Sequence, residues 1–239
     1  MYSFKSRVRY SETDYTGKLK LESILDYFQD CSTFHSEDLG IGLNYLLDLG
    51  KVWLLSYWQI DVIRFPQMGE SITIATYPYE FKGFMGCRNF FMEDGDGHKI
   101  AMANSVWTLF DLENNKPAKI NELMAEKYIT EEKLSMEYEP RKIDISGDFE
   151  QKETIVVKAH HLDTNNHVNN GQYLKIAMDF LPKEYQVGRM RAEYKKSAVL
   201  SDEIVPFVQK NDSGYLIKLC DKSVNPYAVI EIKHITVLQ

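Results

Sequence analysis

Cysteine is scarce in this chain. Its 239 residues include three cysteines, Cys31, Cys87 and Cys220, and their spacing forms no CxxC pair. An odd and scattered set of this kind argues against a disulfide framework and against a structural zinc site. A reducing compartment is therefore expected, and we predict a cytoplasmic protein.

An excess of positive charge and a long apolar run are also missing. The chain has 28 Lys and Arg against 35 Asp and Glu, a formal net charge of −7, which disfavours a nucleic-acid role. No apolar run approaches the length of a membrane span, and the first residues lack the apolar core of a signal peptide, so no membrane association is expected. A hydrophobic content of 44% predicts a packed core in one large domain or two ordinary ones.

The most informative segment is a short polar stretch in the second half of the chain. Asp163, Asn165 and His167 occupy alternating positions, and an amphipathic run at 171–181 follows them and stops at Pro182. The run predicts a helix. A carboxylate, an amide and an imidazole at the start of a helix supply a base, an orienting group and a place for developing negative charge. This arrangement is typical of a hydrolytic site.

The sequence Asp-x-Asn-x-His-Val-Asn-Asn at 163–170 resembles the signature of the acyl-acyl carrier protein (acyl-ACP) thioesterases of the plant and bacterial type. Ser-Val-Trp-Thr-Leu-Phe-Asp at 105–111 and Ala-Glu-Tyr-Lys-Lys at 192–196 are similar to two strands of that family. The family belongs to the hot-dog superfamily. The resemblance implies a tandem hot-dog fold, and hydrolysis of acyl-ACP to a free fatty acid and carrier thiol in fatty acid biosynthesis. It also implies that the N-terminal half contributes the acyl-chain pocket.

The chain departs from this family at one point. Plant members continue the strand that resembles 192–196 with Glu-Cys, two residues proposed to take part in catalysis, whereas this chain has Ser197 and Ala198. A cysteine nucleophile and a glutamate base at these positions are therefore excluded. The reaction is expected to depend on Asp163 as base or nucleophile, on His167 and on Asn165, and the Ser197 hydroxyl is a further candidate.

An internal repeat organises the chain. Shifting the first part of the sequence by 149 positions places Asp14 on Asp163, and the helical pattern that follows each of them then coincides. Thr16 and Lys18 take the places of the Asn and the His, so the first half keeps only the Asp. We therefore expect one active site, in the C-terminal half, and a structural N-terminal half.

Each half changes after its helix to an alternating pattern, which predicts strands. We expect them at 52–65, 70–81, 86–93 and 99–112, and again at 186–197, 203–210, 214–221 and 227–238. The predicted fold class is α+β, with two tandem hot-dog domains that are each a long helix wrapped by an antiparallel β-sheet. The predicted boundaries are 1–130 for the N-terminal domain, 131–150 for an exposed linker and 151–239 for the C-terminal domain. A short helix is expected at 124–134.

Some residues of the motif have competing interpretations. Asp163 and Asn165 also suit a turn, because both residue types form turns and Asp14 recurs without the rest of the motif. Asn169 and Asn170 are expected to cap the helix and to leave nearby amides free for an oxyanion.

His160 and His161 raise the possibility of a metal site with Asp163 and His167. In an extended segment His160 points away from the others, and no second ligand cluster supports a metal, so we expect none. Cys220 is favoured as a buried structural cysteine over a nucleophile.

An acidic enzyme that acts on an acidic carrier needs a local positive surface. The segment 189–196 offers Arg189, Arg191, Lys195 and Lys196, of which the first three share one face of a strand. We expect it to be the landing surface for the carrier, although a merely solvated strand face explains the same pattern.

The prediction is a thioesterase whose partner is acyl carrier protein, acting as a monomer or homodimer. It needs no cofactor, because a thioester is already activated towards hydrolysis. Three alternatives stay open: an acyl-CoA thioesterase, a hot-dog hydratase or dehydratase, and a non-catalytic acyl-binding protein.

Overall fold

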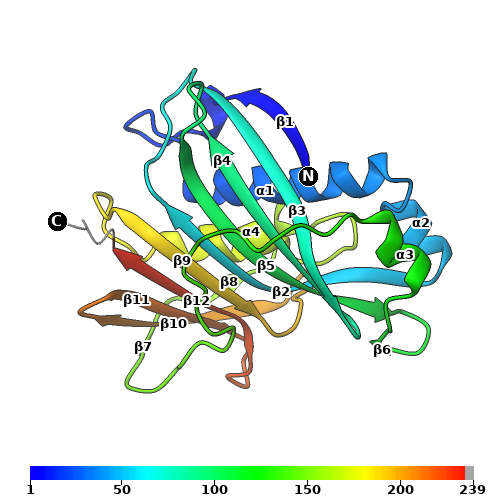
Figure 1. The fold of residues 1–239 in the computed structure, drawn as a ribbon. Coiled ribbons are helices and arrows are strands. Elements are labelled where there is room, and N and C mark those ends of the chain that lie inside the picture. Colours follow the sequence, from blue (N-terminus) through cyan, green and yellow to red (C-terminus); the bar gives the residue numbers. More distant parts are fainter. Residues whose placement is uncertain (235–239) are drawn as a thin grey trace. The chain divides into compact units, whose positions relative to one another are not determined.

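The chain forms two compact units, shown in Figure 1 for a computed structural model that describes residues 1–234. The first unit comprises Met1–Ser56 and Ile60–Tyr138, and the second comprises Tyr57–Gln59 and Glu139–Gln239. Within the described part of the chain, every helix is too short or too polar to cross a membrane.

The first unit is an antiparallel sheet with one long helix. Its strand order is β1-β3-β4-β5-β2, and the short β6 pairs with β5. The strands are β1 (Tyr2–Arg7), β2 (Lys51–Val62), β3 (Ser71–Lys82), β4 (Met85–Glu93), β5 (Lys99–Asp111) and β6 (Lys116–Pro117). The helices are the 3₁₀ helix η1 (Tyr10–Glu12) and the α-helices α1 (Leu21–Asp38), α2 (Leu43–Asp48) and α3 (Glu122–Lys127).

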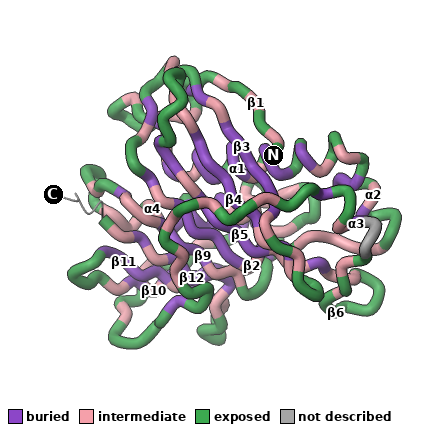
Figure 2. The backbone as a smooth tube through the Cα atoms, in the orientation of Figure 1, coloured by how far each residue is buried: buried purple, intermediate pink, exposed green. Residues whose placement is uncertain are grey.

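Helix α1 packs on β1 and β3 through an apolar stripe. Its buried residues recur at helical spacing and include Leu21, Ile24, Leu25, Phe28 and Cys31. The helix ends just before Gly40, whose φ of +67° suits the left-handed residue that closes many helices. Buried residues run along α1 and along β3, β4 and β5 in Figure 2, so the core of this unit lies between the helix and the sheet.

The second unit repeats this plan with a shorter helix. Its strands run in the order β9-β12-β11-β10, and β7 and β8 both pair with β10. The strands are β7 (Glu150–Gln151), β8 (Ile155–Val156), β9 (Val187–Tyr194), β10 (Glu203–Asn211), β11 (Gly214–Cys220) and β12 (Pro226–His234). The 3₁₀ helix η2 (Ala159–His161) precedes α4 (Asn170–Met178), which packs on β11 and β12. Each unit thus has the build of a hot-dog domain, and the predicted α+β class is confirmed.

The eight predicted strands correspond to β2–β5 and β9–β12, with ends that differ by up to three residues. Residues 235–238 of the last predicted strand lie outside the described residues. The short strands β1, β6, β7 and β8 lie outside the eight predicted ranges. The long helix expected in each half holds for the eighteen residues of α1 but not for the nine of α4. Leu181 precedes Pro182, which disfavours helical backbone at position 181, and α4 ends before that point, at Met178.

Part of the predicted linker is held on the sheet of the first unit. Leu134 packs against Ala75, Tyr77 and Phe91, and its backbone N–H donates to Asn89 Oδ1 at 3.1 Å. The Tyr138 hydroxyl donates to the same oxygen at 3.0 Å. These two hydrogen bonds satisfy the side-chain oxygen of the buried Asn89 and anchor the segment 134–138 to the sheet. The expectation of a wholly exposed linker is therefore wrong for this segment. The expected helix at 124–134 is the shorter α3.

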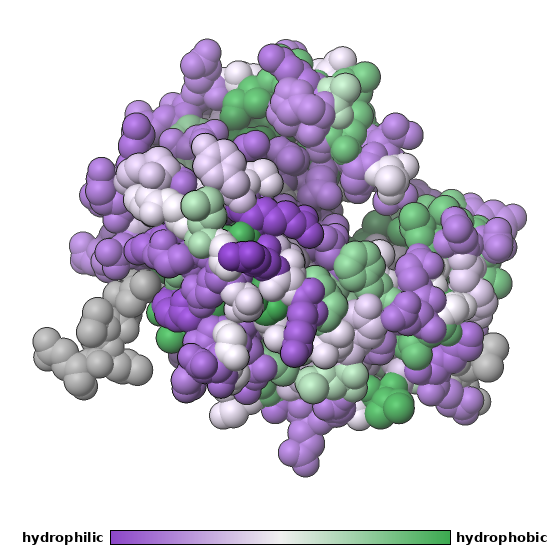
Figure 3. Space-filling view, turned by 90° about the horizontal axis from the view of Figure 1, so that it is seen from above, coloured by the Kyte–Doolittle hydropathy of each residue, from purple (hydrophilic) through white to green (hydrophobic). Residues whose placement is uncertain are grey.

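Hydrophilic residues cover much of the face seen in Figure 3, and hydrophobic ones form separate patches on it. Large exposed apolar side chains occur around α2, where Leu43, Leu47 and Leu49 are 37%, 44% and 45% exposed.

Candidate active site

The sequence motif forms a tight turn organised by the Asp163 carboxylate. Asp163 Oδ1 accepts the backbone N–H groups of Asn165 at 2.8 Å and of His167 at 3.2 Å. The Asp163 N–H donates to the His167 carbonyl at 2.8 Å, and Asn166 closes the turn with a φ of +60°. Asn adopts this left-handed conformation more readily than most residues. Oδ2 of Asp163 has no hydrogen bond among residues 1–234, so it is the oxygen left available to a ligand.

The first unit contains the same turn, 149 residues earlier. Asp14 Oδ1 accepts the N–H groups of Thr16 at 2.8 Å and of Lys18 at 3.1 Å, and Gly17 takes the left-handed position with a φ of +81°. The Asp14 N–H donates to the Lys18 carbonyl at 2.8 Å. η1 and η2 are separated by the same 149 positions. The internal repeat read from the sequence is therefore a repeat of structure.

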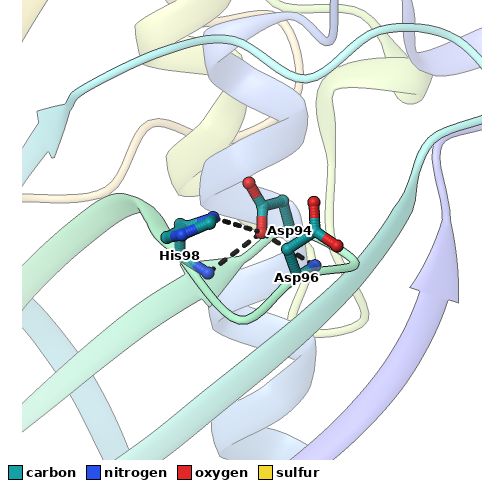
Figure 4. A group of neighbouring side chains, drawn as sticks. All are labelled: Asp94, Asp96 and His98. Atoms are coloured by element: carbon teal, nitrogen blue, oxygen red, sulfur yellow. Dashed lines mark hydrogen bonds and ion pairs between the residues drawn. The ribbon is translucent and has the colours of Figure 1, made fainter.

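Two hairpins use this turn as well. Between β4 and β5, Asp94 Oδ1 accepts the N–H groups of Asp96 at 3.0 Å and of His98 at 2.9 Å (Figure 4). Asp221 repeats the pattern between β11 and β12. Asp94, Asp96 and His98 bring three potential metal ligands within 4.8 Å of one another, but turn formation already accounts for their proximity. The retention of Asp at both 14 and 163 is likewise explained by the turn.

The side chains of Asn165 and His167 distinguish the second turn from the first. Asn165 is exposed and His167 is half-buried. Within residues 1–234, no hydrogen bond joins the side chains of Asp163, Asn165 and His167 to one another. In the first unit, by contrast, the Thr16 hydroxyl donates to Asp14 Oδ1 at 2.7 Å. The structure thus brings the three predicted residues onto one turn and leaves the amide and the imidazole available to a ligand.

Most amides at the start of α4 are already occupied. Asn169 is the N-cap, and its Oδ1 accepts the N–H of Gly171 at 2.8 Å, as predicted for a capping residue. The N–H of Gln172 donates to the Asn169 carbonyl at 2.9 Å, and the N–H of Asn169 donates to the His161 carbonyl at 2.9 Å. Asn170 is the first helical residue rather than a cap, and its N–H has no acceptor among residues 1–234. The expected group of free amides is therefore reduced to this one.

A residue that the sequence did not single out links the turn to the segment after β9. The hydroxyl oxygen of Tyr173, a buried residue of α4, accepts the N–H of Ala198 at 2.8 Å. The Ala198 carbonyl accepts the N–H of Val168 at 2.9 Å, and His167 forms a β-bridge with Val199. Ser197 is exposed in this segment. The helical spacing of apolar residues in α4 places Tyr173 in the core but does not reveal what its hydroxyl holds.

His160 and His161 lie in the 3₁₀ helix η2 rather than in an extended segment, so the geometry expected for them is wrong. The Nδ1 atom of His161 accepts the N–H of Lys158 at 3.1 Å, which leaves its Nε2 as the protonated nitrogen of the neutral ring. Burial, and then electrostatic interaction with His160, Lys158 and Lys175, lower the pKa of His161.

The three cysteines form no disulfide, and none lies in the turn. Cys31 and Cys220 are buried. Burial raises the pKa of Cys31 to about 12 and also raises the pKa of Cys220. Because the thiolate is the nucleophilic form, both environments disfavour thiol catalysis.

The predicted landing strand does not present free positive charge. Each of its four cations is ion-paired with a carboxylate: Arg189 with Glu139, Arg191 with Glu231, Lys195 with Glu193 and Lys196 with Asp221. Arg191 is also buried. The prediction of a free docking surface on this strand is therefore wrong, because acids of the preceding segment, of β9 itself, of the β11–β12 turn and of β12 pair with its cations.

Family models match both halves of the chain. One described as the acyl-ACP thioesterase N-terminal domain matches residues 1–128, and one described as the acyl-ACP thioesterase C-terminal domain matches residues 145–233. A chloroplastic acyl-[acyl-carrier-protein] hydrolase of Cuphea viscosissima is 23% identical over 176 residues, covering 69% of this chain and 43% of the relative. The chloroplastic oleoyl-acyl carrier protein thioesterase 1 of Arabidopsis thaliana is 23% identical over 201 residues, covering 77% and 55%. The chain thus spans about half the length of the curated relatives it matches.

Solved structures show the same fold. An acyl-ACP thioesterase from Bacteroides thetaiotaomicron superposes with a TM-score of 0.89 at 23% identity, covering 97% of this chain and 96% of that one. The 12:0-ACP thioesterase from Umbellularia californica gives a TM-score of 0.83 at 14% identity, with the same coverage of both chains. The fold of these proteins is the fold of the present chain.

Proposed function

We propose an activity for this chain, which belongs to the acyl-ACP thioesterase family: hydrolysis of acyl-ACP to a free fatty acid and carrier thiol. The observation that carries the proposal is the difference between two otherwise equal turns. The second turn presents Asn165 and His167 where the first has Thr16 and Lys18. A single active site in the C-terminal unit, with Asp163, Asn165 and His167 as its catalytic residues, accounts for this difference.

In the proposed mechanism a water molecule attacks the carbonyl carbon of the thioester. Asp163 Oδ2 or the imidazole of His167 takes the proton of the water, and the same proton passes to the sulfur as the C–S bond breaks. The Asn165 amide orients the water, and the Asn170 N–H donates to the developing oxyanion. The products are a carboxylic acid and a thiol. If Asp163 Oδ2 attacks instead, an acyl anhydride forms as the C–S bond breaks and the thiolate leaves. Water then cleaves the anhydride to the fatty acid and the Asp163 carboxylate, and the proton released in this step neutralises the thiolate.

The proposed partner is acyl carrier protein, because the named relatives act on acyl chains carried by it. We place the reaction in fatty acid biosynthesis, in a monomer or homodimer, and in the cytoplasm. Three cysteines that form no disulfide fit a reducing compartment of that kind.

The test is thiol release from a panel of acyl chains on acyl carrier protein and on CoA. His167→Ala is expected to lose on the order of 10²–10⁴ in turnover, because general acid–base help is removed. Lys18→Ala changes the matching position of the first turn and is expected to leave turnover unchanged. Both variants are compared with the wild type by circular dichroism and thermal unfolding.

Near-normal turnover in folded His167→Ala rejects the assignment of the site. An equal loss in Lys18→Ala means that both turns serve one reaction. Turnover of CoA esters alone identifies the protein as an acyl-CoA thioesterase. Bound acyl chains without any thiol release indicate a binding protein.

A further inference from the structure

Four basic side chains gather in the second unit where η2 precedes α4: Lys158, His160, His161 and Lys175. We call them the η2–α4 surface. The rings of His160 and His161 lie 4.2 Å apart between centroids. Electrostatic effects of His160, Lys158 and Lys175 all reach His161. Among residues 1–234, no ion pair includes Lys158 or Lys175, in contrast to the cations of β9.

The internal repeat supplies a control for this cluster. Shifted back by 149 positions, the four residues correspond to Arg9, Ser11, Glu12 and Asp26. One cation and two carboxylates give the first unit a formal charge of −1 at these positions. Two lysines give the second unit +2 with both histidines neutral. Arg9 is moreover paired with Glu12 at 3.3 Å. The sign of this surface is therefore reversed in the unit that presents His167.

The η2–α4 surface borders a depression of about 520 Å³ in the second unit. Val156 and Phe180 give it apolar walls, Lys158 and His160 line it on the basic side, and two acidic residues, Glu153 and Asp179, line it as well. Val156 is 48% exposed. The depression itself therefore suits an apolar side chain of a partner, whose acidic groups would meet Lys158 and Lys175 at its edge.

The corresponding place in the first unit is bridged by side chains. The Tyr27 hydroxyl donates to Glu12 Oε2 at 2.8 Å and lies 3.1 Å from the Ser6 hydroxyl. In the second unit, Ile176 and Ile155 stand at the positions of Tyr27 and Ser6, and they have no polar atoms with which to form such a bridge. The loss of this bridge and the reversal of charge occur together.

We infer that acyl carrier protein docks on the η2–α4 surface, an inference that rests on the proposed function. An acidic carrier is repelled by a chain of net charge −7 and needs a local group of unpaired cations to approach it. The surface is joined directly to the active-site helix, because the His161 carbonyl accepts the N–H of Asn169, the N-cap of α4. Lys158 and Lys175 pair with acidic side chains of the carrier, and the depression receives an apolar one.

The test reverses charge at two positions. Lys158→Glu with Lys175→Glu is compared with Lys142→Glu and Lys210→Glu, a control pair of exposed lysines in the same unit that changes net charge by the same amount. Kinetics are measured with acyl-ACP and with acyl-pantetheine, which lacks both protein and phosphate. Equilibrium binding of fluorescently labelled acyl-ACP is measured separately.

We expect the Lys158/Lys175 variant to raise KM for acyl-ACP about tenfold with little change in kcat, because rim charges act mainly on encounter. Turnover of acyl-pantetheine and all properties of the control pair should stay near those of the wild type. Equal effects on the two substrates, equal effects of the two variants, or undiminished carrier binding each overturn the inference.

The binding measurement separates this inference from the proposed function. A wild-type protein that binds acyl-ACP without hydrolysing it contradicts the proposed activity. The docking inference then stands if binding is lost in the Lys158/Lys175 variant alone. A wild-type protein that does not bind the carrier contradicts the docking inference outright.

Discussion

At the scale of single residues, the two tasks that we propose for Asp163 fall on different oxygens. Oδ1 holds two backbone N–H groups and shapes the turn, as the corresponding atom of Asp14 does in the first unit. Oδ2 is the oxygen we assign to the chemistry. Asn has an oxygen that can replace Oδ1 but no negative charge, so it separates the two tasks.

We therefore predict that Asp163→Asn folds normally and loses on the order of 10²–10⁴ in kcat. Asp14→Asn, the matched change in the first turn, should fold equally well and keep its turnover. Thermal unfolding and thiol release from acyl-ACP measure the two effects. Full activity in Asp163→Asn assigns this residue to the turn alone.

A second residue-scale prediction concerns a buried pair in the first unit. Arg88 and His35 are both buried, and Arg88 donates from Nη1 to His35 Nδ1 at 3.0 Å. Tyr2 stacks on the imidazole, and Tyr128 meets it edge-on. Burial first, then the charges of Arg88 and the N-terminal amine, lower the pKa of His35 to about 4.

The folded pKa of His35 lies below the unfolded value, so the unfolded chain binds the proton more tightly. The contribution of neutral His35 to the free energy of unfolding is complete above about pH 6.5 and is lost as the pH falls towards 4. We expect this loss to reach up to about 3 kcal/mol in the free energy of unfolding. His35→Gln should show a smaller loss than the wild type in urea unfolding at pH 7 and pH 4.5. Equal losses in both proteins contradict the prediction.

At the scale of elements, the side chain of Tyr173 connects the short helix α4 to the segment after β9. Tyr173 holds the buried N–H of Ala198, whose carbonyl in turn holds Val168 beside the turn. Tyr194 makes a weaker link, since its hydroxyl donates at 3.2 Å to the carbonyl of Asn170.

Tyr173→Phe is expected to lower the free energy of unfolding by about 1–3 kcal/mol, because it leaves a buried N–H without an acceptor. Tyr194→Phe removes a hydroxyl from a part-buried helix carbonyl and should cost less than Tyr173→Phe. Chemical denaturation of both variants gives the comparison. A larger loss in Tyr194→Phe contradicts the role assigned to Tyr173.

At the scale of the whole molecule, the net charge of −7 and the unpaired lysines of the η2–α4 surface act in opposite directions on an acidic carrier. Salt screens both effects, over a Debye length of about 10 Å at 0.1 M. The sign of the salt dependence therefore reports which of them dominates the encounter.

We predict that kcat/KM for acyl-ACP falls with rising ionic strength in the wild type. In the Lys158→Glu and Lys175→Glu variant it should rise instead, because screening then removes only repulsion. Acyl-pantetheine should show neither trend. A wild-type rate that increases with salt means that repulsion dominates and that the local attraction is too weak to guide docking.

The sequence by itself determined the features that depend on neighbours along the chain. Alternation of side chains located β2–β5 and β9–β12, and the helical pattern located α1 and α4. The internal repeat, whose copies are offset by 149 positions, predicted two similar units. Asp163, Asn165 and His167 were placed on one turn because they lie within five residues of one another. These features rest on local backbone geometry, which a sequence expresses directly.

Only the tertiary structure decided which charged and polar groups have an ion-pair or hydrogen-bond partner. Arg191 was expected to be a surface cation, but Glu231 of the neighbouring strand pairs with it, at a separation of 40 residues. Ala198 finds its acceptor in Tyr173, 25 residues away. Partners so distant in sequence are set by strand register and helix packing. The free charge, the free amide and the free carboxylate oxygen that a site needs can therefore be identified only after the chain has folded.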